Sequence, residues 1–199
     1  MSTSEPGTRY HHGDLRRALV EAALDALAES GTDALGLRQL ARRVGVSAAA
    51  PYRHFRDRQS LIQAVAAAGF DRFLHTLEAA RSAGSASEQL ADMAEAYIGF
   101  ALANPALYRL MFSYALGAFE DPELRRAADA SYASLAVAAA RVDPDAPGEA
   151  AISAWAFAHG LSMLLLDNQL LGVTPATAAP LIRVLTRRHA QALQRPPTA

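Results

Sequence analysis

Apolar positions recur at helical spacing along nearly the whole chain. Leu15, Leu19, Ala22, Ala23 and Ala26 follow one another at intervals of three or four residues, the pattern of an amphipathic α-helix that buries one face. No segment shows the convincing alternation of apolar and polar residues that a half-buried strand requires. The pattern therefore predicts an all-α protein.

Capping residues and prolines divide this pattern into separate helices. Ser85 and Glu88 have the spacing of a capping box. A capping residue precedes a proline at Asn104-Pro105, Asp121-Pro122 and Thr174-Pro175, where proline suits the first helical position. Gly172 is expected to end the long helix before it. Together these signals predict about nine helices, over residues 13–30, 37–44, 48–55, 58–82, 87–103, 105–116, 122–141, 147–171 and 175–194.

Composition excludes several classes of protein. The 199 residues contain no cysteine, which excludes disulfide frameworks and thiolate metal sites, and the hydrophobic share of 51% is enough for a packed core. No run of 18 apolar residues is present, and residues 1–12 have no apolar signal segment, so we expect a protein of the cytoplasm with no membrane partner. No metal-ligand spacing or phosphate loop occurs, and neither a metal nor a cofactor is expected.

The charge is distributed unevenly along the chain. Residues 9–60 contain nine Arg and six Asp or Glu, a net charge of +3, whereas residues 61–199 contain ten Arg and thirteen acids, a net charge of −3. The first 60 residues are therefore the candidate for binding a polyanion.

Residues 37–55 have the pattern of a helix-turn-helix. Two short predicted helices are joined by Gly45-Val46-Ser47, in which Gly45 can adopt the left-handed conformation and Ser47 can cap the second helix. Leu40, Ala41 and Phe55 are placed to share a core. In a DNA-binding helix-turn-helix the second helix enters the major groove.

The run LGLRQLARRVGVSAAAPYRHFRDRQSLIQAV at 35–65 resembles the DNA-binding domain of the tetracycline-repressor (TetR) family. The start at 10–31, together with Trp155 and His159-Gly160, resembles a subgroup whose C-terminal domain has a Trp-His-Gly signature. The resemblance implies a three-helix DNA-binding domain at 9–56. It also implies a helical ligand-binding and dimerisation domain at 57–195, in which the last two helices form the dimer interface.

The resemblance also implies a set of DNA contacts. Ser47 and Arg58 would bind phosphate, Ala48 and Ala49 would face base edges, and Tyr52 and His54 would touch the backbone. Arg38 would reach a phosphate or a groove edge, and Arg53 would add a polar contact. Pro51 departs from the family pattern and is expected to cost a backbone hydrogen bond and to distort the recognition helix.

The C-terminal half concentrates aromatic and methionine side chains, which suit a mostly apolar effector site with a few polar groups. For His159 a structural hydrogen bond is favoured over lining the site. Gly160, in mid-helix, is expected to be crowded by another helix, and Leu164 and Leu185 are expected at the subunit contact. The candidate ligand-binding residues are Tyr97, Phe100, Tyr108, Met111, Phe112, Tyr132, Trp155, His159 and Met163.

These features favour a DNA-binding transcriptional regulator, in this family most often a repressor. It would bind a palindromic operator in double-stranded DNA as a homodimer and be released by a small, largely apolar effector. An enzyme is not expected, because the only acid–base candidates are His159 with Asp167 or Glu149, and no nucleophile motif is present. The alternative is a helical ligand-binding and dimerisation protein with weak or lost DNA binding, which Pro51 and the three alanines before it leave open.

Overall fold

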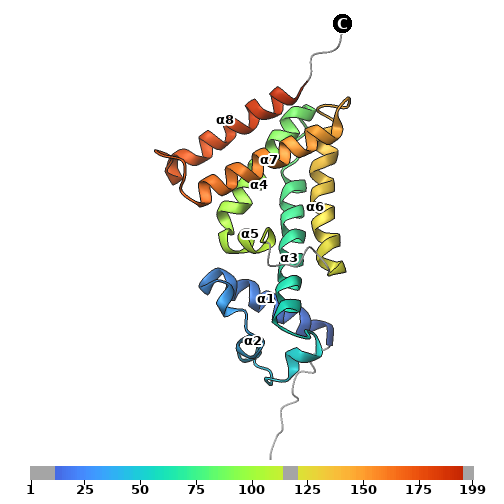
Figure 1. Ribbon diagram of the computed structural model, residues 1–199, viewed down its shortest axis with the longest axis vertical. Helices are drawn as coiled ribbons and strands as arrows, with labels where there is room; N and C mark the ends of the chain where they lie inside the picture. The colour runs from blue at the N-terminus through green and yellow to red at the C-terminus, as the bar shows by residue number, and fades with distance from the viewer. Residues whose placement is uncertain (1–11, 114–120, 195–199) are drawn as a thin grey trace, which may run out of the picture. The chain divides into compact units, whose positions relative to one another are not determined.

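The computed structural model describes residues 12–113 and 121–194, all of which are helix, turn or loop (Figure 1). The all-α prediction is confirmed. The α-helices are α1 (His12–Ser30), α2 (Leu37–Arg43), α3 (Arg58–Ala79), α4 (Ala86–Ala103), α5 (Pro105–Met111), α6 (Pro122–Ala140), α7 (Pro147–Leu166) and α8 (Pro175–Leu193). Two short 3₁₀ helices, η1 (Thr32–Ala34) and η2 (Ala50–Arg53), complete the described part.

Three predicted helices differ from the observed ones. No α-helix spans 48–55, where η2 stands instead, so eight α-helices are described rather than nine. Helix α5 ends at Met111, and residues 114–116 of its predicted span lie outside the described residues. Helix α7 ends at Leu166, before Gly172, because Asn168 adopts the left-handed conformation (φ 53°) and Gln169 N donates to Leu164 O. Asparagine tolerates that conformation better than most residues.

The chain divides into two compact units, Met1–Val65 and Ala66–Ala199, and the division falls inside α3. The predicted domain boundary between 56 and 57 stays a prediction. The core of the first unit is built from buried apolar side chains of α1, α2 and the start of α3, with Phe55 from the loop between η2 and α3. Among them are Leu19, Leu27, Leu40, Ala41, Phe55 and Leu61.

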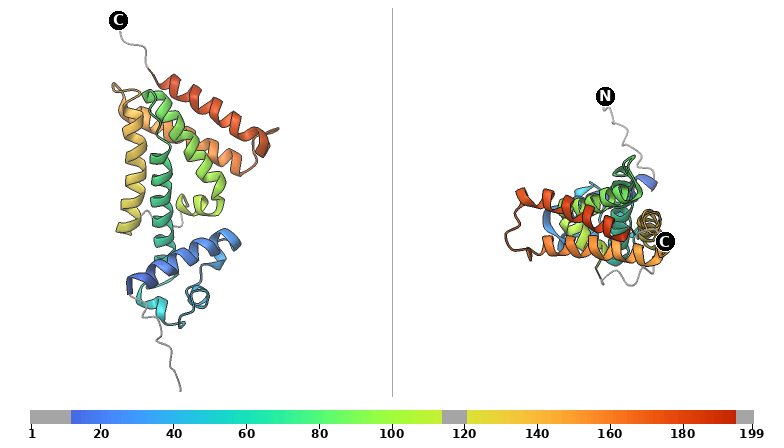
Figure 2. Two further views of the ribbon diagram at one scale, coloured as in Figure 1. Left: turned by 180° about the vertical axis from the view of Figure 1, so that it is seen from behind. Right: turned by 90° about the horizontal axis from the view of Figure 1, so that it is seen from above.

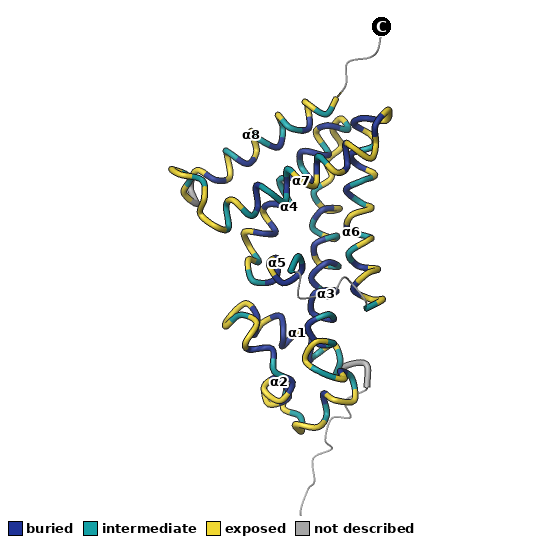
Figure 3. The backbone as a smooth tube through the Cα atoms, in the orientation of Figure 1, coloured by how far each residue is buried: buried dark blue, intermediate teal, exposed yellow. Residues whose placement is uncertain are grey.

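In the second unit α4 packs against α6, α7 and α8, and α7 packs against both α6 and α8 (Figures 1 and 2). Helix α4 begins with the predicted capping box, in which Ser85 and Glu88 each accept from the other's backbone N–H. Its buried side is apolar, whereas α6 and α8 alternate between buried and exposed positions along their length (Figure 3).

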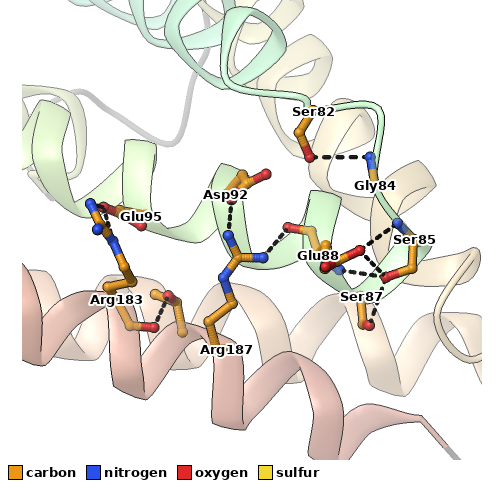
Figure 4. A network of polar contacts seen from close by, with 10 residues as sticks. Ser82, Gly84, Ser85, Ser87, Glu88, Asp92, Glu95, Arg183 and Arg187 are labelled. Atoms are coloured by element: carbon orange, nitrogen blue, oxygen red, sulfur yellow. Dashed lines mark hydrogen bonds and ion pairs between the residues drawn. The ribbon is translucent and has the colours of Figure 1, made fainter.

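An apolar cluster and two ion pairs hold α8 against α4. Ile98, Leu161, Ala178 and Ile182 form the cluster, and Leu185 packs against it from within the same subunit. Arg187 pairs with Asp92 at 2.6 Å and Arg183 with Glu95 at 3.3 Å (Figure 4). Ion pairs that remain partly open to water contribute about 0–1 kcal/mol each, so the apolar contacts dominate.

Helix α7 is apolar but incompletely covered. By length and composition it would be able to cross a membrane, as core helices of water-soluble proteins also would, yet only 33% of its apolar window is buried within the described chain. No helix of the described chain crowds Gly160, because a Cβ there would meet no atom within 4 Å, and close contact with a helix of a second copy stays a prediction. The reason is that Gly160 lies on the uncovered side of the helix.

The glycines of α3 and α4 predict opposite responses to the same substitution. A Cβ on Gly69 would lie 2.9 Å from Leu107 Cδ1 and Met111 Sδ, whereas one on Gly99 would meet nothing within 4 Å. Gly99→Ala should raise the free energy of unfolding by about 0.5–1 kcal/mol through helix propensity. Gly69→Ala should lower it by about 1 kcal/mol through overpacking against α5. Urea denaturation measures both, and a shift of the same sign in the two variants would contradict the packing described here.

The free energy of unfolding should fall as the pH is lowered below the ordinary histidine pKa of about 6.5. Burial lowers the pKa of His189, opposed by a backbone hydrogen bond at Ser153, and its ring stacks on Phe157 with centroids 4.2 Å apart. The folded state therefore binds fewer protons than the unfolded state, so its stability is retained above that pH and lost below it. Urea denaturation at pH 5.5 and 7.5 should show a smaller difference in the free energy of unfolding between the two pH values for His189→Phe than for the parent. An equal difference in the two proteins would contradict this role of His189.

Candidate DNA-binding surface and effector site

The turn between α2 and η2 has the backbone that the sequence predicts. Gly45 adopts φ 73°, and the N–H groups of Gly45 and Val46 donate to the carbonyls of Arg42 and Ala41. These bonds satisfy the last carbonyls of α2 and reverse the chain within a few residues. Leu40, Ala41 and Phe55 are buried together in this unit, as expected.

Pro51 costs no backbone hydrogen bond, and a short 3₁₀ turn stands around it in place of the predicted α-helix. It lies in the first turn of η2, where a backbone N–H needs no intrahelical acceptor, so no hydrogen bond is lost. Its ring is buried, and its carbonyl accepts from the N–H groups of His54 and Phe55, both at 2.9 Å. Ala50 stays in the helical turn and donates to Ser47 O. The predicted capping role of Ser47 is also wrong, because Ala49 is the capping residue of η2 and no side chain caps it.

Seven of the eight predicted DNA-contact residues are exposed, and they lie on α2, the turn, η2 and the start of α3. The exposed set is Arg38, Ser47, Ala48, Ala49, Tyr52, Arg53 and Arg58. Tyr52 is 49% exposed, which excludes the alternative of a core aromatic. His54 is half-buried and has partners within the chain.

Ion pairing separates two classes of arginine on this surface. Arg43 forms a two-pronged ion pair with Glu29, at 2.6 and 2.7 Å, and Arg56 pairs with Asp57. Among the described residues no carboxylate pairs with Arg38, Arg42 or Arg53, and Arg58 donates to the carbonyl of Thr32. The unneutralised positive charge therefore belongs to Arg38, Arg42, Arg53 and Arg58. Sequence reasoning did not separate Arg42 from Arg43, because both belong to the same short run.

In the second unit three polar side chains from α4, α5 and α7 form a closed triangle. Tyr108 Oη lies 2.8 Å from His159 Nδ1, Tyr97 Oη lies 3.2 Å from the same nitrogen, and Tyr108 donates to Tyr97 at 3.2 Å. Both tyrosines are buried. The favoured structural hydrogen bond of His159 is present in the structure.

Burial keeps this triangle uncharged at neutral pH. It raises the pKa of Tyr97 far above the ordinary value and that of Tyr108 to about 12. It lowers the pKa of His159. Each shift has desolvation as its largest cause, since the charged form of each group would have to leave water.

Aromatic rings surround the triangle. Phe112 lies 4.8 Å from Tyr108 and 4.9 Å from His159, between ring centroids. At the exposed edge, the Trp155 ring lies 6.4 Å from His159 and 5.6 Å from Tyr132, and both outer rings are 41% exposed. We call this set the aromatic cluster; it comprises Phe70, Phe73, Tyr97, Phe100, Tyr108, Phe112, Tyr132, Trp155 and His159.

Seven of the nine predicted ligand-binding residues are thus brought together. Met111 is buried and its sulfur lies against Gly69 of α3, and Met163 is half-buried without a described ring contact. Sequence reasoning missed Phe70 and Phe73 of α3, although the apolar stripe of that helix includes both. Phe73 lies 4.7 Å from Tyr97 and 5.1 Å from Phe100. No group of three possible metal ligands occurs among the residues that the structure describes.

Two family models match this chain. The model of bacterial regulatory proteins of the tetR family matches residues 19–65, and the model of the tetracyclin repressor-like C-terminal domain matches residues 90–189. A 50-residue stretch is 48% identical to the class A tetracycline repressor of transposon 1721 from Escherichia coli, covering 25% of this chain and 23% of that protein. A 112-residue stretch is 29% identical to the HTH-type transcriptional regulator Mb1846 of Mycobacterium bovis, covering 55% of this chain and 48% of that protein.

Solved structures extend the similarity over the full length. A protein of unknown function from Rhodococcus sp. RHA1 is 35% identical with a TM-score of 0.80, covering 95% of this chain and 100% of that one. The putative regulatory protein SCO4313 is 26% identical with a TM-score of 0.70, covering 94% and 100%. The Trp-His-Gly subgroup stays a prediction. With both halves of the chain matched and the predicted left-handed turn at Gly45 present, this chain belongs to the TetR family of bacterial regulatory proteins.

Proposed function

We propose that this protein is a DNA-binding transcriptional regulator of the cytoplasm, a repressor that binds a palindromic operator as a homodimer and is released by a small effector. The observation that carries the proposal is the exposed α2–η2 surface, with Tyr52 and three arginines that no described carboxylate neutralises. The relatives named as a tetracycline repressor and as a transcriptional regulator support it.

The shape of η2 limits how this surface reads DNA. Ala48 and Ala49 are exposed but offer only methyl groups, which suit thymine methyls in the major groove. Arg38, Tyr52 and Arg53 supply the polar contacts. Since η2 is only a short 3₁₀ turn, a larger share of specificity falls to DNA shape than in a longer recognition helix.

The uncovered side of helix α7 is the observation that supports the proposed homodimer. This side presents Ile152, Ala156, Gly160 and Leu164, which recur every four residues. Ala156 and Gly160 are small, and the open space at Gly160 leaves room for a close helix crossing. A second copy that packs on this side would bury the apolar surface that one chain leaves in water.

The aromatic cluster is the observation that supports the proposed effector site. Helix α3 begins at Arg58 in the DNA-binding unit and contributes Phe70 and Phe73 to the cluster, so one helix is shared by both functions. If the effector binds the cluster more tightly in one position of α3 than in another, it would change the affinity for DNA. DNA would then change the affinity for the effector by the same factor. The alternative, a helical ligand-binding and dimerisation protein with weak or lost DNA binding, is favoured only by the shortness of η2 and by the alanines at 48–50.

Operator affinity should depend on Arg53 and not on a matched arginine of the other unit. An operator selected from random duplex DNA should give a slope of log K against log salt of about −5 to −9, if each subunit neutralises three to five phosphates. Arg53→Gln should weaken binding and make the slope shallower by about 2 per dimer. Arg141→Gln, whose guanidinium bonds only Gln89 among described side chains, should change neither. Failure to select any bound sequence would favour the alternative without DNA binding.

Two leucines of similar exposure test the dimer face. Leu164 on α7 is 39% exposed and Leu102 on α4 is 37% exposed. Leu164→Glu should place an unpaired carboxylate in the subunit contact and produce monomers in sedimentation, with operator binding lost. Leu102→Glu should remain dimeric and bind DNA. Leu185 is a poor probe, because it packs within its own subunit. A Leu164→Glu protein that stays dimeric would place the interface elsewhere.

A further inference from the structure

The hydroxyl protons of Tyr97 and Tyr108 determine the tautomer of His159. Tyr108 donates to Tyr97, and the acceptor then left for the Tyr97 hydroxyl among the described residues is His159 Nδ1. If the tyrosines exchange roles, Nδ1 accepts from Tyr108 instead. With Tyr108 donating to Tyr97, a proton on Nδ1 would leave the buried Tyr97 hydroxyl without a described acceptor, which is costly. The neutral ring therefore carries its proton on Nε2.

This Nε2–H group is accessible and has no partner in the part of the chain that the structure describes. His159 is half-buried, and its described hydrogen bonds all involve Nδ1. Its Nε2 is not among the buried polar atoms that lack a partner, which in the described residues are Ser134 Oγ and His189 Nε2. The imidazole thus presents one N–H donor to the outside of the triangle, beside the rings of Phe112 and Trp155.

Among the described residues no carboxylate or guanidinium is bonded to the triangle, so none there would balance a charged ligand. The ion pairs nearest in the sequence to its members join other residues, Arg109 with Asp167 and Arg126 with Asp71. The ammonium group of a cationic ligand would face the N–H donor of His159. It would find no acceptor there to replace the water molecules that it loses on binding. A carboxylate would leave water for a single neutral donor, which does not offset the desolvation of an ion.

We propose that the aromatic cluster binds an uncharged aromatic ligand that carries a hydrogen-bond acceptor such as a carbonyl oxygen, and that Nε2–H of His159 donates to that acceptor. The inference rests on the effector site proposed above and names its ligand class. The rings supply apolar contact and edge-to-face packing, and the one donor sets the orientation of the ligand.

Four naphthalene probes that differ in one substituent test the ligand class. Titration calorimetry of the whole protein at pH 7.5 compares methyl 2-naphthoate, 2-naphthoate, 2-naphthylmethylammonium and 2-methylnaphthalene. The ester should bind about tenfold more tightly than each of the others, the ratio expected for one net hydrogen bond or one unbalanced charge. Tighter binding of either ion, equal binding of 2-methylnaphthalene, or no binding of any probe would overturn the inference.

Substitutions at His159 test the donor. His159→Phe should weaken ester binding about tenfold, to the level of 2-methylnaphthalene. His159→Gln, which keeps an N–H donor and an acceptor for the tyrosines, should retain most of the affinity. His75→Phe removes an exposed imidazole from α3 and should leave ester binding unchanged. Ester binding by His159→Phe equal to that of the parent would also overturn the inference. If His159→Phe fails to fold, the probe ranking and His159→Gln still decide.

Operator binding without any probe separates this inference from the proposed function. Both His159 variants should bind the selected operator as the parent does. If the operator is bound but the ester is not preferred, the ligand class is wrong and the regulator stands. If the ester is preferred but no DNA is bound, the ligand class stands and the regulator is wrong.

Discussion

Burial of helix α4 is the interaction on which the larger unit depends. Its buried side chains face α6, α7 and α8, so loss of α4 would expose apolar surface on all three helices. Burying a large apolar side chain stabilises a fold by about 1.5–3 kcal/mol, and α4 contributes Leu90, Met93, Ile98 and Phe100 in addition to Tyr97. The ion pairs between α4 and α8 select a register on the outside of this packing and add little to its stability.

The same helix imposes a polar requirement on the core. Tyr97 brings a hydroxyl into a dry region, and a buried hydroxyl without a partner is destabilising. Tyr108 from α5 and His159 from α7 satisfy it, so hydrogen bonding joins three helices that apolar packing alone would hold less specifically. The proposed ligand preference of this unit rests on the same neutral, hydrogen-bonded cluster.

In the DNA-binding unit some arginines are paired with carboxylates and others have no described carboxylate partner. Arg43 is neutralised by Glu29, which ties α2 to α1, whereas Arg38 and Arg42 on the same helix have no described carboxylate partner. Like charges four residues apart on a helix destabilise it by about 0.2–0.5 kcal/mol, a small cost that a polyanion would reverse. The fold therefore separates structural arginines from those available to phosphate.

The sequence by itself determined the helical class, most helix starts, the left-handed Gly45 and the family, because caps, prolines and apolar periodicity are local signals. Tertiary structure decided what those signals do not encode. Pro51 costs no hydrogen bond because the chain forms a short 3₁₀ turn around its buried ring, and Gly160 is open within one subunit because α7 leaves one side uncovered. Phe70 and Phe73 joined Tyr97 and His159 only through packing of α3 against α4 and α5. Which arginine is paired and which nitrogen of His159 carries the proton depend on partners distant in sequence, so no local pattern determines them.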